Sequence, residues 1–290
     1  MPSSDDSDDG TAPLTTNAPT RRAFLASGAA AATVGLAGCS FGTGPLETER
    51  STNVYSIPAG TAIDVSNANG DVVVEPMPEG DDVEVGILKR TRGGRDRFDR
   101  VSVLSGVDDG TLELETDYEG ALAPGRVSVD LTVRVPEGHP LVAARTGNGD
   151  VTATDVAGDA DLGSGNGDVI AENVDGYVDL ETANGDTEAT GTTGLTGARS
   201  ANGDVAVEVF ALREAVSCSS GNGDVDVGVP ADLSADVTLS VGNGDLVVEG
   251  VDLENRSGGG DRITGQLNGG GPELSCEVGN GDVRLYGLDT

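Results

Sequence analysis

The sequence predicts an all-β protein: an elongated, single-chain parallel β-solenoid (β-helix) with about 18 residues per coil, preceded by a less regular β-strand region. An Asn-Gly-Asp triplet returns every 18 residues, at Asn148, Asn166, Asn184 and Asn202. Around each triplet, apolar or small residues alternate with polar ones, as in short strands with one buried face. Trp is absent and Phe and Tyr number four each, so the expected core is thin and built from Val, Leu, Ala and Thr. A fixed period of this length indicates stacked repeats.

The triplet is expected to form one corner of each coil. Gly permits the positive φ that a tight corner requires, and Asn tolerates it better than most residues. Stacked Asn amides can then form a hydrogen-bonded ladder from coil to coil. The triplets continue at Asn222, Asn243 and Asn280 with spacings of 20, 21 and 37 residues, and an outlying copy begins at Asn69. The alternatives are serial hairpins, for which Asn-Gly is also a signal, and a calcium-binding β-roll, whose Gly- and Asp-rich run is degenerate in the second half of each coil here.

Residues 1–38 are expected to form a disordered leader and a signal sequence. Arg21 and Arg22 precede an Ala-rich apolar stretch that ends in Leu-Ala-Gly before Cys39, and this stretch is short for a membrane span. The segment resembles a twin-arginine lipoprotein signal. The resemblance implies export of the folded chain, cleavage before Cys39, a lipid on its sulfur, and a place on the extracytoplasmic face of the cell membrane. The alternative is an amphipathic surface helix.

The remaining chain divides by regularity. Residues 39–53 are expected to be a lipidated tether, and residues 54–145 an irregular β-strand region with a hairpin turn at 107–110. Residues 146–290 are expected to be the Asn-Gly-Asp repeat solenoid. Within it, the Gly-rich segment 254–272 interrupts the pattern and is interpreted as a loop insertion, a common place for function on a solenoid.

A family resemblance follows from three features. These are the first Asn-Gly-Asp-Val strand at residue 69, the segment Val-Asp-Leu-Thr-Val-Arg-Val-Pro at 129–136, and the serial Asn-Gly-Asp-Val coils. Together they are similar to the putative adhesin family of β-strand-repeat proteins, a domain of unknown function. The resemblance covers residues 54–288 and implies an all-β solenoid at the cell surface, with no catalytic residue carried over.

Composition limits the partners. The formal net charge is -33, with 50 acidic residues against 17 basic ones, which argues against nucleic-acid binding because that requires a basic footprint. Abundant Asp with a single lysine resembles the proteins of salt-adapted (halophilic) haloarchaea. Molar salt shortens the Debye length to about 3 Å and makes such charge tolerable.

Stacking the triplets would place one carboxylate per coil along one edge, which could bind calcium or other cations. Adjacent charges about 4.8 Å apart repel by about 0.9 kcal/mol in water, so this edge is expected to need cations or salt. The edge comprises Asp150, Asp168, Asp186, Asp204, Asp224 and Asp245.

A basic segment stands out on this acidic chain and could bind an anionic envelope polymer or another molecule's acidic edge. The alternative is a solvated loop neutralised by Asp96, Asp99 and nearby carboxylates. Its basic residues are Lys89, Arg90, Arg92, Arg95, Arg97 and Arg100. Separately, Asn255 begins an Asn-Arg-Ser glycosylation sequon.

No catalytic pattern is present in the sequence. His139 is the only histidine and is expected on the surface without a catalytic partner, and no phosphate loop, Cys-x-x-Cys or metal spacing occurs. The prediction is therefore a lipid-anchored, non-enzymatic surface protein without cofactor or metal, which binds an envelope polysaccharide or a surface protein or acts as a spacer. The alternatives are a lyase-like carbohydrate-active β-helix and an envelope scaffold that self-associates through its open coil ends.

Two cysteines give a geometric prediction. Cys218 and Cys276 each lie four residues before a triplet Asn, in the inward slot, and Leu239 fills that slot in the coil between them. Two coils correspond to roughly 9.6 Å, beyond the reach of a disulfide. The sequence thus predicts two buried free thiols.

Overall fold

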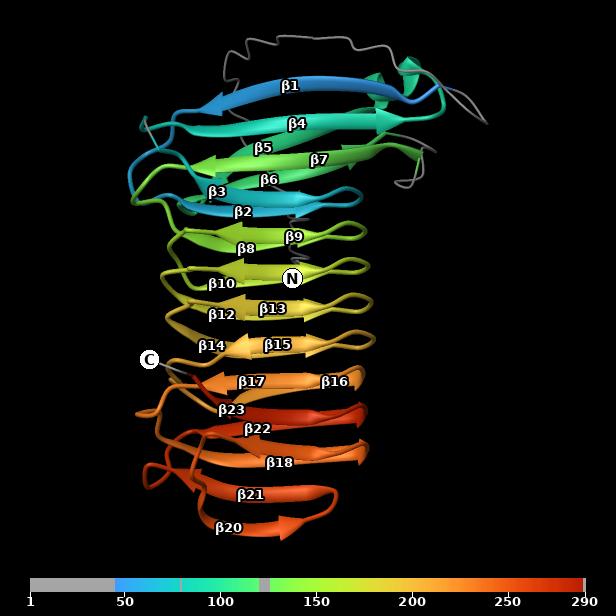
Figure 1. Ribbon diagram of the computed structural model, residues 1–290. Coiled ribbons are helices and arrows are strands. Elements are labelled where there is room, and N and C mark those ends of the chain that lie inside the picture. The colour runs from blue at the N-terminus through green and yellow to red at the C-terminus, as the bar shows by residue number, and fades with distance from the viewer. Residues whose placement is uncertain (1–44, 79, 120–125, 289–290) are drawn as a thin grey trace, which may run out of the picture.

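The chain forms two long β-sheets stacked face to face. The computed structural model describes residues 45–78, 80–119 and 126–288, and Figure 1 shows the coils stacked along one axis. One sheet has 11 strands and the other has 12, and most neighbouring strands within them run parallel. Within the described residues, the one helix is the short 3₁₀ segment η1 (Arg95–Arg100). The predicted all-β class and its parallel stacking are therefore confirmed.

Each regular coil gives one strand to each sheet. The chain runs along the 12-stranded sheet, turns at the Asn-Gly-Asp corner, and returns along the 11-stranded sheet. In β10 and β12, Ala160 lies opposite Val178, and in β11 and β13, Val169 lies opposite Thr187. The five coils are β8 (Leu141–Thr146) and β9 (Val151–Thr154), β10 (Ala160–Ser164) and β11 (Val169–Glu172), β12 (Tyr177–Thr182) and β13 (Thr187–Thr190), β14 (Gly194–Ser200) and β15 (Val205–Glu208), and β16 (Val216–Asn222) and β17 (Val225–Val229).

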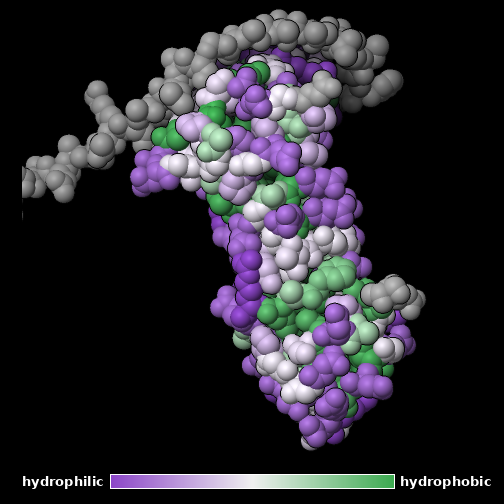
Figure 2. Space-filling model, turned by 90° about the vertical axis from the view of Figure 1, so that its left-hand side faces the viewer, coloured by the Kyte–Doolittle hydropathy of each residue, from purple (hydrophilic) through white to green (hydrophobic). Residues whose placement is uncertain are grey.

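The core is a narrow layer between the two sheets. In β12, Val178 and Leu180 point inward and are fully buried, and Ala189 of β13 faces them. Because alternate side chains of a strand point to opposite faces, the polar residues between them reach the surface. Figure 2 shows the corners opposite the Asn-Gly-Asp edge, where hydrophilic side chains surround an apolar area in the lower half of the stack.

The outlying triplet belongs to the first coil of the same stack. β2 (Ala62–Asn67) and β3 (Val72–Pro76) flank this triplet and pair in parallel with β8 and β9. The region predicted to be irregular therefore contributes strands to both sheets and belongs to the same stack.

The remaining N-terminal strands close this end of the stack. β4 (Val83–Thr91), β7 (Ser128–Val135) and β1 (Glu47–Tyr55) extend the 11-stranded sheet, and β5 (Val101–Asp108) and β6 (Thr111–Tyr118) extend the other. The predicted hairpin is confirmed, with Asp109 and Gly110 both at positive φ in its turn. The tether predicted to reach residue 53 is too long, because β1 begins at Glu47 and pairs antiparallel with β4.

At the C-terminal end, the strand order departs from the chain order. β18 (Ala235–Asn243) and β19 (Leu246–Glu249) leave a gap next to β16 and β17, and β22 (Glu273–Asn280) and β23 (Val283–Gly287) fill it. Between them, β20 (Glu254–Gly259) and β21 (Arg262–Leu267) form an antiparallel hairpin that pairs with β18. The segment predicted as a loop is therefore part of the sheet.

This order corrects the cysteine prediction. Cys218 and Cys276 both occupy the inward slot and are fully buried, as expected. However, they lie opposite each other on adjacent strands, and Leu239 pairs with Cys276 from the far side. The expected separation of two coils is wrong because the last coil of the chain is inserted between the two preceding ones.

Candidate functional site

The Asn-Gly-Asp corners form a continuous hydrogen-bonded edge, on the right in Figure 1. The Nδ2 of Asn166 donates to the Oδ1 of Asn148 at 3.0 Å, and the Nδ2 of Asn184 donates to the Oδ1 of Asn166 at 2.9 Å. The same contact continues through Asn202, Asn222, Asn280 and Asn243. The predicted Asn ladder is confirmed, and the Asn side chains have a structural role.

The aspartates of the corners also connect coil to coil. The carboxylate of Asp150 accepts the backbone N–H of Asp168 at 2.9 Å, and the carboxylate of Asp168 accepts that of Asp186 at 2.9 Å. The carboxylates of the full row follow the spatial order Asp71, Asp150, Asp168, Asp186, Asp204, Asp224, Asp282 and Asp245. Sequence reasoning missed Asp71 and Asp282, the first because it is distant in the chain and the second because its coil is inserted.

Cation binding along this edge stays a prediction. Each bridging carboxylate already stabilises the next coil through a backbone hydrogen bond, which offsets part of the repulsion between neighbouring charges. Among residues 45–78, 80–119 and 126–288, no group of three or more His, Cys, Asp or Glu side chains is arranged to hold a metal ion.

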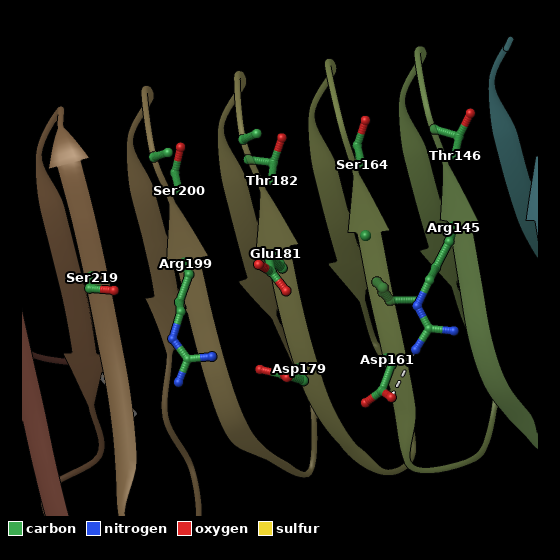
Figure 3. Close-up of a pocket in the computed structure, with 14 residues that line it drawn as sticks. Arg145, Thr146, Asp161, Ser164, Asp179, Glu181, Thr182, Arg199, Ser200 and Ser219 are labelled. Atoms are coloured by element: carbon green, nitrogen blue, oxygen red, sulfur yellow. Dashed lines mark hydrogen bonds and ion pairs between the residues drawn. The ribbon is translucent and has the colours of Figure 1, made fainter. Parts of the chain in front are cut away.

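A hollow of about 600 Å³ lies on the outer face of the 12-stranded sheet, across β8, β10, β12, β14 and β16. Figure 3 shows its labelled side chains in three rows that cross these strands, and the row nearest the corners is Thr146, Ser164, Thr182 and Ser200. The strand register gives one row as Arg145, Gly163, Glu181, Arg199 and Ser219. The next row in the register is Ala143, Asp161, Asp179, Gly197 and Ser217, of which Asp161 and Asp179 line the hollow.

Small residues create the space in this hollow. A Cβ atom on Gly197 would stand 2.3 Å from the Oδ1 of Asp179, so glycine is required there for the carboxylate to lie across the neighbouring strand. Beyond Arg199 the row continues with the short side chain of Ser219. The floor is therefore open between two arginines, Arg145 and Arg199, with carboxylates between them.

The charges in the hollow are only partly compensated. The Nη2 of Arg145 donates to the Oδ2 of Asp161 at 3.0 Å. Burial raises the pKa of the Asp179 carboxyl above its ordinary value, Arg199 opposes this, and Asp161 and Glu181 add to it. Arg199 forms no ion pair with another described residue. A polar ligand could thus meet hydroxyls, carboxylates and a guanidinium on one surface.

Sequence reasoning did not find this hollow. The alternation of polar and apolar residues identifies these positions only as the outer face of strands with one buried face. The signal was present, since Gly163, Gly197, Ser217 and Ser219 occupy outward positions where long polar side chains would otherwise stand. Recognising it requires the register between strands, because the hollow is formed across five coils.

The basic residues of the predicted segment have different surroundings in the structure. The Nζ of Lys89 donates to the carbonyl oxygens of Phe98 and Val101, at 3.1 and 2.6 Å, and pairs with Glu49. Arg95 pairs with Glu47. These two side chains hold η1 and β1 in place.

Three other arginines of the segment face a second pocket. Arg90, Arg92 and Arg97 line it together with Arg126, which sequence reasoning did not include. Arg90 pairs with Asp130, and Arg100 lies exposed outside the pocket. Among the described residues, Asp96 and Asp99 form no ion pair with these arginines, and the carboxylates that pair with the basic segment are those of Glu47, Glu49 and Asp130.

The other predicted positions are placed as follows. His139 is buried, and its Nδ1 lies 2.9 Å from the carbonyl oxygen of Thr61 and donates to it, so the expected surface position is wrong. The turn that carries His139 packs against the first coil, which covers the ring. Asn255 is exposed on β20, and its Nδ2 donates to Gln266. Arg21, Arg22 and Cys39 lie outside the described residues.

A family model describes this stack. The model for Toastrack DUF4097 matches residues 37–286, which includes all the coils and both ends of the stack. The chain belongs to the Toastrack DUF4097 family. Among curated proteins, none matches it.

Solved structures similar to this Toastrack chain share little sequence with it. A putative adhesin from Bacteroides fragilis is 14% identical with a TM-score of 0.44, covering 82% of this chain and 97% of that one. A putative lipid binding protein from Parabacteroides distasonis is 14% identical with a TM-score of 0.41, covering 83% and 97%. A putative cell adhesion protein from Clostridium sporogenes is 13% identical with a TM-score of 0.34, covering 82% and 100%.

In the part of the Toastrack chain that the structure describes, no helix has the length and apolar character needed to cross a membrane.

Proposed function

We propose that this chain is a lipid-anchored protein of the extracytoplasmic membrane face, in which the solenoid carries a polysaccharide-binding surface away from the membrane without catalysis. The observation that carries the binding role is the hollow on the 12-stranded sheet. Its carboxylates, its guanidinium groups and the Ser219 hydroxyl offer hydrogen-bond donors and acceptors in register, at the spacing of the coils. A polyhydroxylated polymer of the cell envelope fits this chemistry.

The shape of the molecule supports a spacer role. β1 is the first strand of the 11-stranded sheet and β19 is the last. Ten strand intervals of about 4.8 Å separate them, so the stack is about 50 Å long. The proposed lipid site, Cys39, lies eight residues before β1. A lipid there would hold the N-terminal end at the membrane, with the far coils projecting outward.

Binding of purified envelope polysaccharide from the source cells tests the hollow. Glu181→Gln and Arg199→Gln should each weaken binding about tenfold, because each removes a charge from the central row. Glu188→Gln is the matched control: it lies exposed on β13, in the same coil as Glu181 but on the opposite sheet. Equal effects of all three variants, or no binding by the parent chain, would overturn the assignment.

The same samples test the absence of catalysis. The polysaccharide should keep its chain length after incubation with the protein. Release of new chain ends that is lost in Asp179→Asn or Arg199→Gln would instead favour the lyase-like alternative, since such enzymes combine carboxylates with a basic group.

Anchoring and export are tested in cells. Cys39→Ser should release the protein from the membrane fraction, and Arg21→Lys with Arg22→Lys should block its export. A Cys39→Ser protein that still partitions into detergent would contradict the lipid anchor.

A further inference from the structure

A second pocket, of about 710 Å³, lies at the N-terminal end of the stack and is lined by arginines. Arg90 and Arg92 come from the end of β4 and the residue after it, Arg97 from η1, and Arg126 from the segment before β7. Asn69 of the first corner and Ser128 complete its polar lining. Segments that are distant in the sequence thus bring four guanidinium groups together.

The pocket has an excess of positive charge. Asp130 pairs with Arg90, whereas Arg92, Arg97 and Arg126 form no ion pair with any residue that the structure describes. The adjoining sequence 120–125, Gly-Ala-Leu-Ala-Pro-Gly, contains no carboxylate. On a chain with a net charge of -33, three uncompensated arginines at one site favour an anionic ligand.

Two local features hold this pocket in shape. The buried Thr91 hydroxyl donates to the carbonyl oxygen of Arg126 at 2.9 Å and accepts the N–H of Gly93 at 3.1 Å. These bonds connect the end of β4 to the segment before β7. A Cβ atom on Gly93 would stand 1.8 Å from the Cζ of Arg97. Glycine therefore makes room for the Arg97 guanidinium at this point of the pocket.

The position of the pocket indicates which anion it meets. Leu46 lines the pocket, and its side chain is 46% exposed. Leu46 is the seventh residue after Cys39, so a lipid on Cys39 would keep the pocket within about 25 Å of the membrane surface. Lipid phosphates are the densest anions at that surface, and guanidinium groups bind phosphate with paired, charge-assisted hydrogen bonds.

We propose that the arginine pocket binds the phosphate of an anionic membrane lipid and docks the N-terminal end of the solenoid on the membrane. The choice of a membrane lipid rests on the proposed lipid anchor. A second contact at the anchored end would restrict the tilt of the stack and so keep the hollow, on the side face of the 12-stranded sheet, from lying against the membrane.

Vesicle binding tests this docking without the anchor. The full-length chain carrying Cys39→Ser is mixed with vesicles of phosphatidylcholine containing 30% phosphatidylglycerol and sedimented, at 0.1 M and 2 M KCl. It should bind these vesicles at both salt concentrations, because 2 M KCl screens the repulsion between the acidic chain and the anionic vesicle as well as the long-range attraction of the arginines, and it affects contact hydrogen bonds least. Vesicles of phosphatidylcholine alone should bind at least tenfold more weakly.

Charge-matched variants separate the pocket from overall charge. In the same background, Arg92→Gln with Arg126→Gln should weaken binding at least tenfold. Arg256→Gln with Arg262→Gln, exposed at the opposite end of the stack, should leave it within twofold. Equal losses in both pairs, or no binding by the parent, would overturn the proposal. Thermal melting confirms that each variant is folded.

A titration with inorganic phosphate distinguishes the source of the anion. Phosphate should compete with the vesicles for the parent chain. Saturable phosphate binding that requires Arg92 and Arg126, without vesicle binding, would refute the membrane lipid as the ligand. Because the vesicle experiment uses unlipidated protein, its result is independent of whether Cys39 carries a lipid in cells.

Discussion

One buried hydroxyl interrupts the apolar column of the 11-stranded sheet. Thr187 occupies the inward slot that Val169 and Val205 fill on the neighbouring strands. Its side chain is 1% exposed, and its Oγ1 has no hydrogen-bond partner among the described residues. A buried hydroxyl without a partner destabilises a fold by about 1–3 kcal/mol.

We expect Thr187→Val to raise the free energy of unfolding by about 1 kcal/mol, because valine has nearly the same shape and no polar atom. Urea denaturation measures this. Thr182→Val in the same coil is the control, since the Thr182 hydroxyl donates to the carbonyl oxygen of Gly167 at 2.8 Å. Thr182→Val should lower the free energy of unfolding by about 1 kcal/mol. A loss of stability in Thr187→Val would contradict the geometry.

The corner glycines carry the tightest constraint in the coils. Gly185 has a φ of +141°, and a Cβ there would stand 2.2 Å from the carbonyl oxygen of Gly167. We expect Gly185→Ala to destabilise the protein by at least about 2 kcal/mol. Gly163→Ala should be neutral or stabilising by up to about 1 kcal/mol, because its nearest contacts would be at 3.6 and 3.7 Å. Similar melting temperatures for the two variants would refute this account of the corner.

At the scale of the strand, the sequence pattern predicts local structure well. The inward slots, the Asn ladder and the turn at Asp109 and Gly110 follow from period-two alternation and from the residues that tolerate positive φ. β1 was missed because its sequence, Glu-Thr-Glu-Arg-Ser-Thr-Asn-Val-Tyr, is mostly polar, as suits a strand at the edge of a sheet. The hairpin of β20 and β21 was missed for a related reason, since every residue of β20 is exposed.

The paired cysteines permit a test at this scale. The hydrogen bond with Cys218, together with burial, raises the pKa of Cys276 well above its ordinary value. The Cys276 thiol should therefore be protonated at neutral pH and unreactive, because the thiolate is the nucleophile. Complete burial keeps a reagent from both cysteines in the native state. We expect a thiol reagent to modify neither cysteine in the native state. In denaturant without reductant, it should modify both.

Adjacent parallel strands place their Cα atoms about 4.8 Å apart, within the range of a disulfide. In a Cys39→Ser background, which leaves these two cysteines alone, a count of zero in denaturant would therefore identify a disulfide between β16 and β22, contradicting the predicted free thiols. Reaction in the native state would contradict the burial of the pair.

For the whole molecule, the row of carboxylates along the Asn-Gly-Asp edge adds to a large net negative charge. We expect the melting temperature to rise steeply with KCl, because neighbouring carboxylates repel by about 0.9 kcal/mol in water and salt screens them. Asp168→Asn with Asp186→Asn should reduce this dependence, since the Asn Oδ1 can still accept the backbone N–H of the next coil. If the melting temperature of the parent chain did not change with salt, repulsion between the carboxylates would be ruled out as a limit on its stability.

The order of the coils could not be predicted from the sequence. Every coil presents similar inward aliphatic side chains and the same Asn-Gly-Asp corner, so this pattern does not distinguish which coils the last one lies between. The triplets therefore determine the register between neighbouring coils, but they do not determine the order in which the coils are stacked. The antiparallel pairing of β21 with β18 occupies the outer edge of β18, which leaves only its inner edge for β22. The hollow could not be predicted for the same reason, because its lining depends on which strands become neighbours.

Engineered disulfides test the inserted coil directly. Ser219 of β16 lies opposite Glu277 of β22, which lies opposite Ser240 of β18. In a background of Cys39→Ser, Cys218→Ala and Cys276→Ala, the pair Ser219→Cys with Glu277→Cys should form a disulfide under mild oxidation, since its Cα atoms are about 4.8 Å apart. Ser219→Cys with Ser240→Cys should not, at about 9.6 Å. Peptide mapping by mass spectrometry distinguishes them. If the coils followed chain order, β18 would lie next to β16, and the second pair would link instead of the first.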